Sequence, residues 1–164
     1  GGQRQRVMIA MMLLAKPVLL IADEPTTALD VTVQAEILQL LATLKRDLDL
    51  SLLMISHDLG VMADIADTLL VLYTGRVLEQ GRAAQVLSAP SHPYTQALLA
   101  CRPRLDTPWD VPLPSISGTP ARASVTTDGC VFAPRCGRVQ ALCRTAPPPL
   151  RDFGDGGASA CHFS

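Results

Sequence analysis

Two apolar runs of the sequence end in side chains that could act on a phosphate. The run 18–22 is followed at once by Asp23 and Glu24, and the run 50–55 is followed by Ser56 and His57. A carboxylate can hold Mg²⁺ directly or through its water shell, and a second carboxylate beside it can polarise a water molecule. The alternative is structural: two loop carboxylates ahead of a capped helix, and a histidine satisfied at a strand end.

The elements that must position these residues alternate along the chain. Helix-forming composition and helical spacing predict helices over residues 3–15, 31–48 and 59–66. Continuous apolar runs predict strands over residues 18–22 and 50–55, and residues 68–73 and 76–79 flank a Thr-Gly turn that predicts a hairpin. This order predicts an α/β fold around a mainly parallel sheet. Ligands of such sheets bind beyond the carboxyl ends of the strands, where Asp23, Glu24 and His57 all fall.

The first helix is expected to be well buried, because apolar residues occur on nearly every side of it. We expect Met8, Met11 and Met12 to fill the core rather than to bind a metal. The same apolar stretch resembles a secretory signal or a membrane span at first sight. Lys16-Pro17 interrupts it and no small-residue cleavage site follows, so both are disfavoured.

Composition restricts the classes of function. The chain has 164 residues, a formal net charge of −1 and 48% hydrophobic residues, which is typical of a globular protein. It carries no basic footprint, and only 4% of its residues are aromatic, so nucleic acid is not an expected partner. Nine of the 13 prolines follow Cys101, which indicates a change of organisation near residue 100.

Two further motifs accompany the acidic pair. Gly1, Gly2 and Gln3 immediately precede a predicted helix, where unpaired backbone N–H groups and the helix dipole favour phosphate. Ala-Leu-Asp ends at Asp30, ahead of the next helix. Taken as an ordered set with Asp-Glu-Pro and the strand-end histidine, these motifs resemble the ATP-binding cassette (ABC) ATPases.

The resemblance implies a role for each motif. Residues 1–3 match the end of the signature sequence, which in the family contacts the nucleotide held by the opposite subunit. Asp23 matches the aspartate that supports Mg²⁺, and Glu24 matches the general base for water. Asp30 ends the loop that communicates across the dimer, and His57 matches the switch histidine that contacts the γ-phosphate. All of these serve in-line phosphoryl transfer from ATP.

The phosphate cradle of the family is missing from the sequence. No G-x-x-x-x-G-K-[ST] motif occurs, and the chain opens with Gly-Gly rather than Met. We therefore interpret the chain as the C-terminal part of a P-loop NTPase-type ABC ATPase domain, beginning inside the signature, with a small Cys-rich extension. The chain alone is not expected to hydrolyse ATP.

The string from Asp23 to Gln34, the His-Pro-Tyr-Thr sequence at residues 92–95 and the cysteine-bearing tail resemble the oligopeptide, dipeptide and nickel uptake branch. The resemblance implies a peripheral ATPase on the cytoplasmic face of the bacterial inner membrane. Its partners would be transmembrane permease subunits, a homologous ATPase subunit in a head-to-tail dimer and, indirectly, a solute-binding protein. The expected divisions are residues 1–88 for the ATPase portion, 89–128 for a helix and Pro-rich linker, and 129–164 for the tail.

Four cysteines lie in the tail, at Cys130, Cys136, Cys143 and Cys161. Two disulfides would suit an oxidising compartment, whereas a cytoplasmic ATPase keeps thiols reduced. Reduced, the set suits a [4Fe–4S] cluster, which some members of the branch carry, or Zn²⁺, although no C-x₂₋₄-C pair occurs. Unmetallated thiols are the third alternative, and His162 could substitute as a ligand.

Two hypotheses of different class follow. In the first, the chain is the energy-coupling ATPase portion of a peptide importer. In the second, it is a metal-binding interaction module whose ATPase-like part is a vestigial remnant. The intact Asp23, Glu24 and His57 favour the first hypothesis, and the missing phosphate cradle favours the second.

Overall fold

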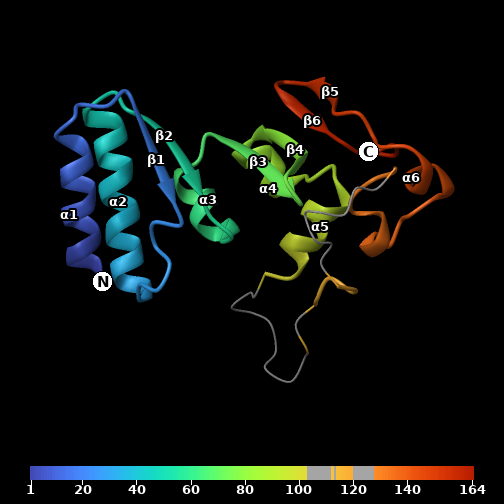
Figure 1. The fold of residues 1–164 in the computed structure, drawn as a ribbon, viewed down its shortest axis with the longest axis horizontal. Helices are drawn as coiled ribbons and strands as arrows, with labels where there is room; N and C mark the ends of the chain where they lie inside the picture. Colours follow the sequence, from blue (N-terminus) through green and yellow to red (C-terminus); the bar gives the residue numbers. More distant parts are fainter. Residues whose placement is uncertain (103–111, 113, 120–127) are drawn as a thin grey trace. The chain divides into compact units, whose positions relative to one another are not determined.

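The computed structural model describes residues 1–102, 112, 114–119 and 128–164 (Figure 1). Most of the predicted Pro-rich linker, residues 103–111, 113 and 120–127, lies outside the described residues. The chain forms two compact units, Gly1–Ile65 and Ala66–Ser164, and each is described by itself. The division falls after the third predicted helix rather than at the change of composition near residue 100.

The first unit contains the helix–strand alternation predicted from the sequence. Its elements are α1 (Gly2–Leu13), β1 (Leu19–Asp23), α2 (Val31–Asp47), β2 (Ser51–Ile55) and α3 (Leu59–Ile65). β1 and β2 pair in parallel, from Leu19 opposite Ser51 to Asp23 opposite Ile55. Because the two strands run in register, their carboxyl ends fall side by side, as the predicted site requires.

The core of the first unit lies between the helices and the strand pair. Its buried members come from α1, β1, α2 and the residue just before β2: Ile9, Leu20, Ile37, Leu41 and Leu50. Figure 1 shows α1 and α2 side by side, next to β1 and β2. Side chains alternate between the two faces of a strand, so Leu20 is buried whereas Leu19 and Ile21 are exposed.

The expectation of a well-buried first helix was wrong. Only Ile9 of α1 is buried, and Met8, Met11 and Met12 are 39%, 65% and 50% exposed. The cause is that α1 packs against α2 and the core through a single face. The helix therefore has apolar residues on every side, but only the side that meets α2 and the core is buried.

The second unit is built on the predicted hairpin. β3 (Thr68–Tyr73) and β4 (Arg76–Arg82) pair antiparallel around a turn in which Thr74 and Gly75 have φ of 49° and 79°. The remaining elements are α4 (Ala83–Ser88), α5 (Pro93–Ala100), the 3-10 helix η1 (Ala133–Arg135), α6 (Ala141–Thr145), β5 (Arg151–Gly154) and β6 (Gly157–Ser159). The hairpin prediction is confirmed.

The tail completes this sheet, whose strand order is β3-β4-β6-β5. β6 pairs antiparallel with β4, with Glu79 opposite Ser159, and the N–H of Ala160 donates to the carbonyl oxygen of Leu78 at 2.8 Å. Tyr73 and Phe132 pack together with Leu78 in the core of this unit. Within the described residues, parallel pairing is thus confined to β1 and β2.

Glu79 and His92 explain the Ser-His-Pro-Tyr sequence before α5. The Glu79 carboxylate, 1% exposed, accepts the N–H groups of Ser91 at 2.6 Å and His92 at 3.1 Å. His92 Nδ1 in turn accepts the N–H of Tyr94 at 3.0 Å and so caps α5. Burial of His92 lowers its pKa from 6.5 to about 4, against the opposing effect of a backbone hydrogen bond at Ala160. Residues 91–94 therefore have a structural role in this unit, at the start of α5.

Candidate functional site

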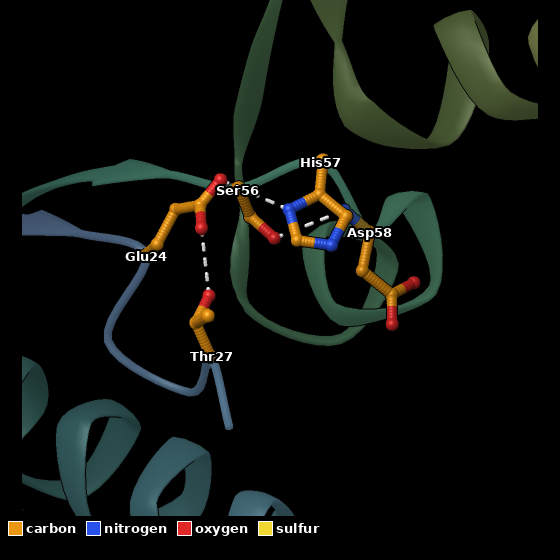
Figure 2. A network of polar contacts seen from close by, with 5 residues as sticks. All are labelled: Glu24, Thr27, Ser56, His57 and Asp58. Carbon is orange, nitrogen blue, oxygen red and sulfur yellow. Dashed lines mark hydrogen bonds and ion pairs between the residues drawn. The ribbon is translucent and has the colours of Figure 1, made fainter. Parts of the chain in front are cut away.

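The parallel strand pair brings the two predicted catalytic residues together. The N–H of Glu24 donates to the carbonyl oxygen of Ile55 at 2.9 Å, which ties the end of β1 to the end of β2. His57 Nδ1 then lies 2.9 Å from Glu24 Oε1 (Figure 2). An ionised carboxylate only accepts hydrogen bonds, so in this pairing Nδ1 carries the proton and Nε2 remains available.

A third residue completes the contact. Thr27 Oγ1 donates to Glu24 Oε2 at 2.7 Å, from the opposite side of the carboxylate to His57 (Figure 2). The N–H of Thr27 also donates to the carbonyl oxygen of Glu24 at 3.2 Å. Glu24 has φ of 45° and Ala28 has φ of 64°, a left-handed backbone that non-glycine residues seldom adopt. Strained backbone of this kind is concentrated at functional sites.

The electrostatics favour an ionised Glu24. The hydrogen bond from His57 lowers the pKa of the Glu24 carboxyl most, and the hydrogen bond from Thr27 lowers it further. The side chains of Glu24 and His57 are 43% and 76% exposed. In this unit both groups are therefore open to a ligand, and Glu24 is present as a carboxylate at neutral pH.

Ser56 and Asp58 shape the turn that carries His57. The N–H of Asp58 donates to Ser56 Oγ at 3.0 Å, and Asp58 Oδ1 accepts the N–H of Gly60 at 2.7 Å. Figure 2 shows the Asp58 carboxylate turned away from Glu24. These two side chains serve the start of α3 rather than the Glu24–His57 contact.

The predicted magnesium residue, Asp23, is exposed at the end of β1, opposite Ile55. In the described part of the chain, the side-chain partners of the Glu24 carboxylate are Thr27 and His57, and the Asp23 carboxylate takes no part in these hydrogen bonds. Asp30 has a structural contact: its Oδ1 accepts the N–H of Val33 at 2.9 Å and caps α2. Asp30 is thus the cap of the helix that follows the acidic pair. Its role in communication across a dimer stays a prediction.

Gly1 and Gly2 sit against the start of α2. A Cβ added to Gly1 would lie 2.6 Å from Leu29 Cδ2, and a Cβ added to Gly2 would clash with Val33 Cγ1. Figure 1 shows the beginning of α1 beside the beginning of α2. The two glycines are therefore needed for close approach of these segments, and Gln3 next to them is exposed.

The four tail cysteines line one pocket, of about 20 Å³, together with aromatic and histidine side chains. Burial raises the pKa of the Cys130 and Cys136 thiols. Within the described residues, no three His, Cys, Asp or Glu side chains are placed to hold one metal ion. The structure therefore does not support the predicted iron–sulfur or zinc site.

Thr27 is the residue of the site that sequence reasoning missed. Sequence patterns alone assign it no part in the chemistry. The sequence does contain one indication, because the Thr27 hydroxyl lies three positions after Glu24. A single turn of the chain places side chains at this spacing on the same side. The direction of the hydroxyl depends on the positive φ of Glu24, which the sequence does not reveal.

The chain matches two family descriptions. Residues 1–27 match the ABC transporter family, and residues 78–143 match the oligopeptide/dipeptide transporter C-terminal region. No helix within the described ranges is both long enough and apolar enough to cross a bilayer.

Curated relatives match over almost the whole chain. The oligopeptide transport ATP-binding protein OppD of Salmonella typhimurium is 52% identical over 98% of this chain and 48% of its own length. The dipeptide transport ATP-binding protein DppD of Escherichia coli is 44% identical over 99% of this chain and 50% of its own length. The chain thus spans about half the length of these relatives. Names of this kind do not support the alternative of a vestigial remnant.

Solved structures give the same fold. The structure of cbiO1 from Clostridium perfringens, part of the ABC transporter complex cbiONQ, has a TM-score of 0.51 and 35% identity, and the match covers 54% of this chain and 35% of that one. The ADP conformation of MJ1267, an ATP-binding cassette of an ABC transporter, has a TM-score of 0.51 and 27% identity over 58% of this chain and 39% of that one. The strand ends that carry Glu24 and His57 thus belong to an ABC ATPase fold, and the chain is a member of the ABC transporter ATP-binding family, in its oligopeptide/dipeptide branch.

Proposed function

We propose that this chain forms the catalytic and switch half of an ATP-hydrolysing subunit that drives the import of oligopeptides or dipeptides. The observation that carries the proposal is the contact between Glu24 and His57 at the ends of two parallel strands. A carboxylate and an imidazole that follow the ends of two strands thus lie together, and a terminal phosphoryl group and its attacking water would lie beside them.

Glu24 is suited to act as the general base. Its carboxylate is ionised and 43% exposed, so it can accept a proton from a water molecule. His57 is suited to contact the terminal phosphate, because Nδ1 faces Glu24 and, among the hydrogen bonds of the described residues, Nε2 takes part in none. Catalysis of phosphoryl transfer rests mostly on such positioning and on charge neutralisation.

Asp23 would hold Mg²⁺. Its carboxylate is exposed at the ligand edge of the strand pair and is not engaged in the Glu24 hydrogen bonds of the described site, so the donor is available. Carboxylate oxygen is the ligand type that Mg²⁺ prefers, and the ion would neutralise charge on the phosphates of ATP.

The segment Gly1–Gln3 and the loop ending at Asp30 would act as one surface toward the nucleotide of a second ATPase subunit. Their support is the close approach of Gly1 and Gly2 to Leu29 and Val33. The start of α1 offers backbone N–H groups to phosphate. Displacement of either segment would then disturb the other.

The partners and location follow from the relatives rather than from the geometry. We infer a homologous ATPase subunit, transmembrane permease subunits on the cytoplasmic face of the bacterial inner membrane, and indirectly a solute-binding protein. The relatives named for oligopeptide and for dipeptide transport are 52% and 44% identical to the chain, so both substrate classes stay within the proposal.

A chimera tests the catalytic proposal. Residues 1–164 would replace the matching half of the Salmonella OppD protein, and phosphate release would be measured with ATP and Mg²⁺. Glu24→Gln is expected to lower turnover by about 100-fold or more, the size of general-base effects. Asp58→Asn is the matched control, because this nearby carboxylate is turned away from the site. Undiminished turnover in Glu24→Gln would contradict the proposal.

For the tail we propose a thiolate metal site that forms only with rearrangement of the pocket. Its support is the gathering of the four cysteines around one pocket and the backbone N–H groups of Arg138 and Phe163, each 3.4 Å from the sulfur two residues earlier. Metal content and visible absorption of the purified chain test it. Cys143→Ser should abolish bound iron or zinc and Cys101→Ser should not. A metal-free wild-type chain after anaerobic reconstitution would contradict the proposal.

A further inference from the structure

We propose that Thr27 is a positioning residue that holds the Glu24 carboxylate in its working orientation through the hydrogen bond from Oγ1 to Oε2. The description of Glu24 as a base rests on the proposed function. The hydrogen bond itself does not, and the experiment below separates the two.

Two anchors fix the carboxylate where one would not. Thr27 binds Oε2 at 2.7 Å and His57 binds Oε1 at 2.9 Å, from different segments of the chain. The terminal torsion of a glutamate side chain is broad, so a single hydrogen bond leaves the carboxylate plane free to turn. With both oxygens engaged, the plane is defined.

The two anchors differ in how firmly they are attached to Glu24. Thr27 also donates its backbone N–H to the carbonyl oxygen of Glu24 at 3.2 Å, so its backbone and its side chain both bind the same residue. His57 comes from the end of the other strand and is 76% exposed. A ligand can therefore draw His57 away, whereas Thr27 stays with Glu24.

The hydroxyl is suited to this task. A threonine hydroxyl can donate to the carboxylate at every pH at which the protein folds, and it carries no charge that would compete for a phosphate. Its hydrogen bond and that of His57 engage the two oxygens of the Glu24 carboxylate separately. Two other titratable groups lie next to Glu24 and His57 in sequence, namely Asp23 and Asp58. The hydrogen bonds of the described residues do not connect either of them to Glu24.

Carboxyl and imidazole titration by NMR on the 164-residue chain tests the proposal. The variants are Thr27→Val, which keeps the shape and removes the hydroxyl, and Thr27→Ser, which keeps the hydroxyl. Thr32→Val is the matched control, on an exposed position of α2. The midpoint of the Glu24 carboxyl carbon should move to higher pH in Thr27→Val and stay at the wild-type value in the other two. An unchanged midpoint in Thr27→Val would overturn the proposal.

A second measurement needs no variant, in case Thr27→Val fails to fold. In the wild-type chain, the methyl and amide signals of Thr27 should shift with the same midpoint as the Glu24 carboxyl carbon. Thr27 signals that ignore the protonation of Glu24 would overturn the proposal. If they follow it while Glu24→Gln in the chimera keeps full turnover, the positioning contact stands and the proposed catalytic function fails.

Discussion

Protonation of His92 should destabilise the second unit as the pH falls. The ring is 1% exposed, and its pKa of about 4 lies below the ordinary 6.5 of an unfolded chain. Between these two values the unfolded state binds the proton and the folded state does not. Stability therefore falls as the pH drops from 6.5 to about 4 and is unaffected by this residue above 6.5.

The expected size follows from the same two values. At 1.36 kcal/mol for each pH unit, the gap between 6.5 and about 4 corresponds to about 3 kcal/mol of lost stability at pH 4. This is an upper figure, because the Glu79 carboxylate at the His92 N–H would partly offset the buried charge. Protonation also removes the Nδ1 lone pair that caps α5, so charge and cap are lost together.

Urea unfolding followed by near-ultraviolet circular dichroism provides the assay. The chain's two tyrosines, Tyr73 and Tyr94, pack edge to face in the second unit, with their ring centroids 4.8 Å apart. Their near-ultraviolet signal therefore reports on the tertiary structure of this unit. A reductant and a chelator keep the cysteines free of metal. His92→Asn is the control, because asparagine can cap a helix without titrating. The wild type should lose stability between pH 6.5 and 4 and the variant should lose less; equal losses in both would refute the reasoning.

Three further predictions concern the first unit, and urea unfolding monitored by far-ultraviolet circular dichroism measures each. Asp30→Ala should cost about 1 kcal/mol through loss of the α2 cap, whereas Asp30→Asn should cost little; equal effects would contradict the capping role. Ile37→Ala should cost about 2–5 kcal/mol because Ile37 is fully buried, and truncation of the exposed Val31 to Ala should be nearly neutral. Gly2→Ala should cost about 1–3 kcal/mol by overpacking against Val33. The double variant Gly2→Ala/Val33→Ala should lose less stability than the two single variants added together. Strictly additive losses would argue against the close approach of Gly2 to Val33.

Much of the first unit could be predicted because its signals are local. Pro17 ends one helix region, Asp30 caps the next, and short apolar runs mark the strands. The observed bounds of α2 and β2 lie within a residue of those expected. Glu24 and His57 could be expected to meet because the carboxyl ends of two parallel strands lie side by side. This expectation depends on the topology of the sheet rather than on either residue alone.

The tail could not be predicted in the same way. β5 and β6 are four and three residues long, and β6 consists of Gly, Ala and Ser, which give no apolar alternation. Their partner, β4, lies far away in the sequence, and the Glu79–Ser159 pairing depends on the whole second unit being assembled. Cysteine spacing likewise indicated that the thiols gather, but the width of the pocket between them depends on packing.

The burial of α1 was also predicted wrongly, and the error has a simple cause. The number of apolar residues in α1 does not reveal how many neighbours the helix has. Ile9 belongs to the core with residues of α2 and β1, whereas Met11 and Met12 are 65% and 50% exposed. Composition predicts that a helix can be buried, and only its neighbours decide which of its faces is.

The central claim is that Glu24 and His57 act on one phosphoryl group, and a double-variant cycle tests it most directly. Phosphate release would be measured in the chimera for Glu24→Gln, His57→Ala and the double variant. Residues that act as a unit show strongly non-additive losses, so the double variant should be about as slow as the slower single variant. Losses that multiply, as for two independent sites, would contradict the account.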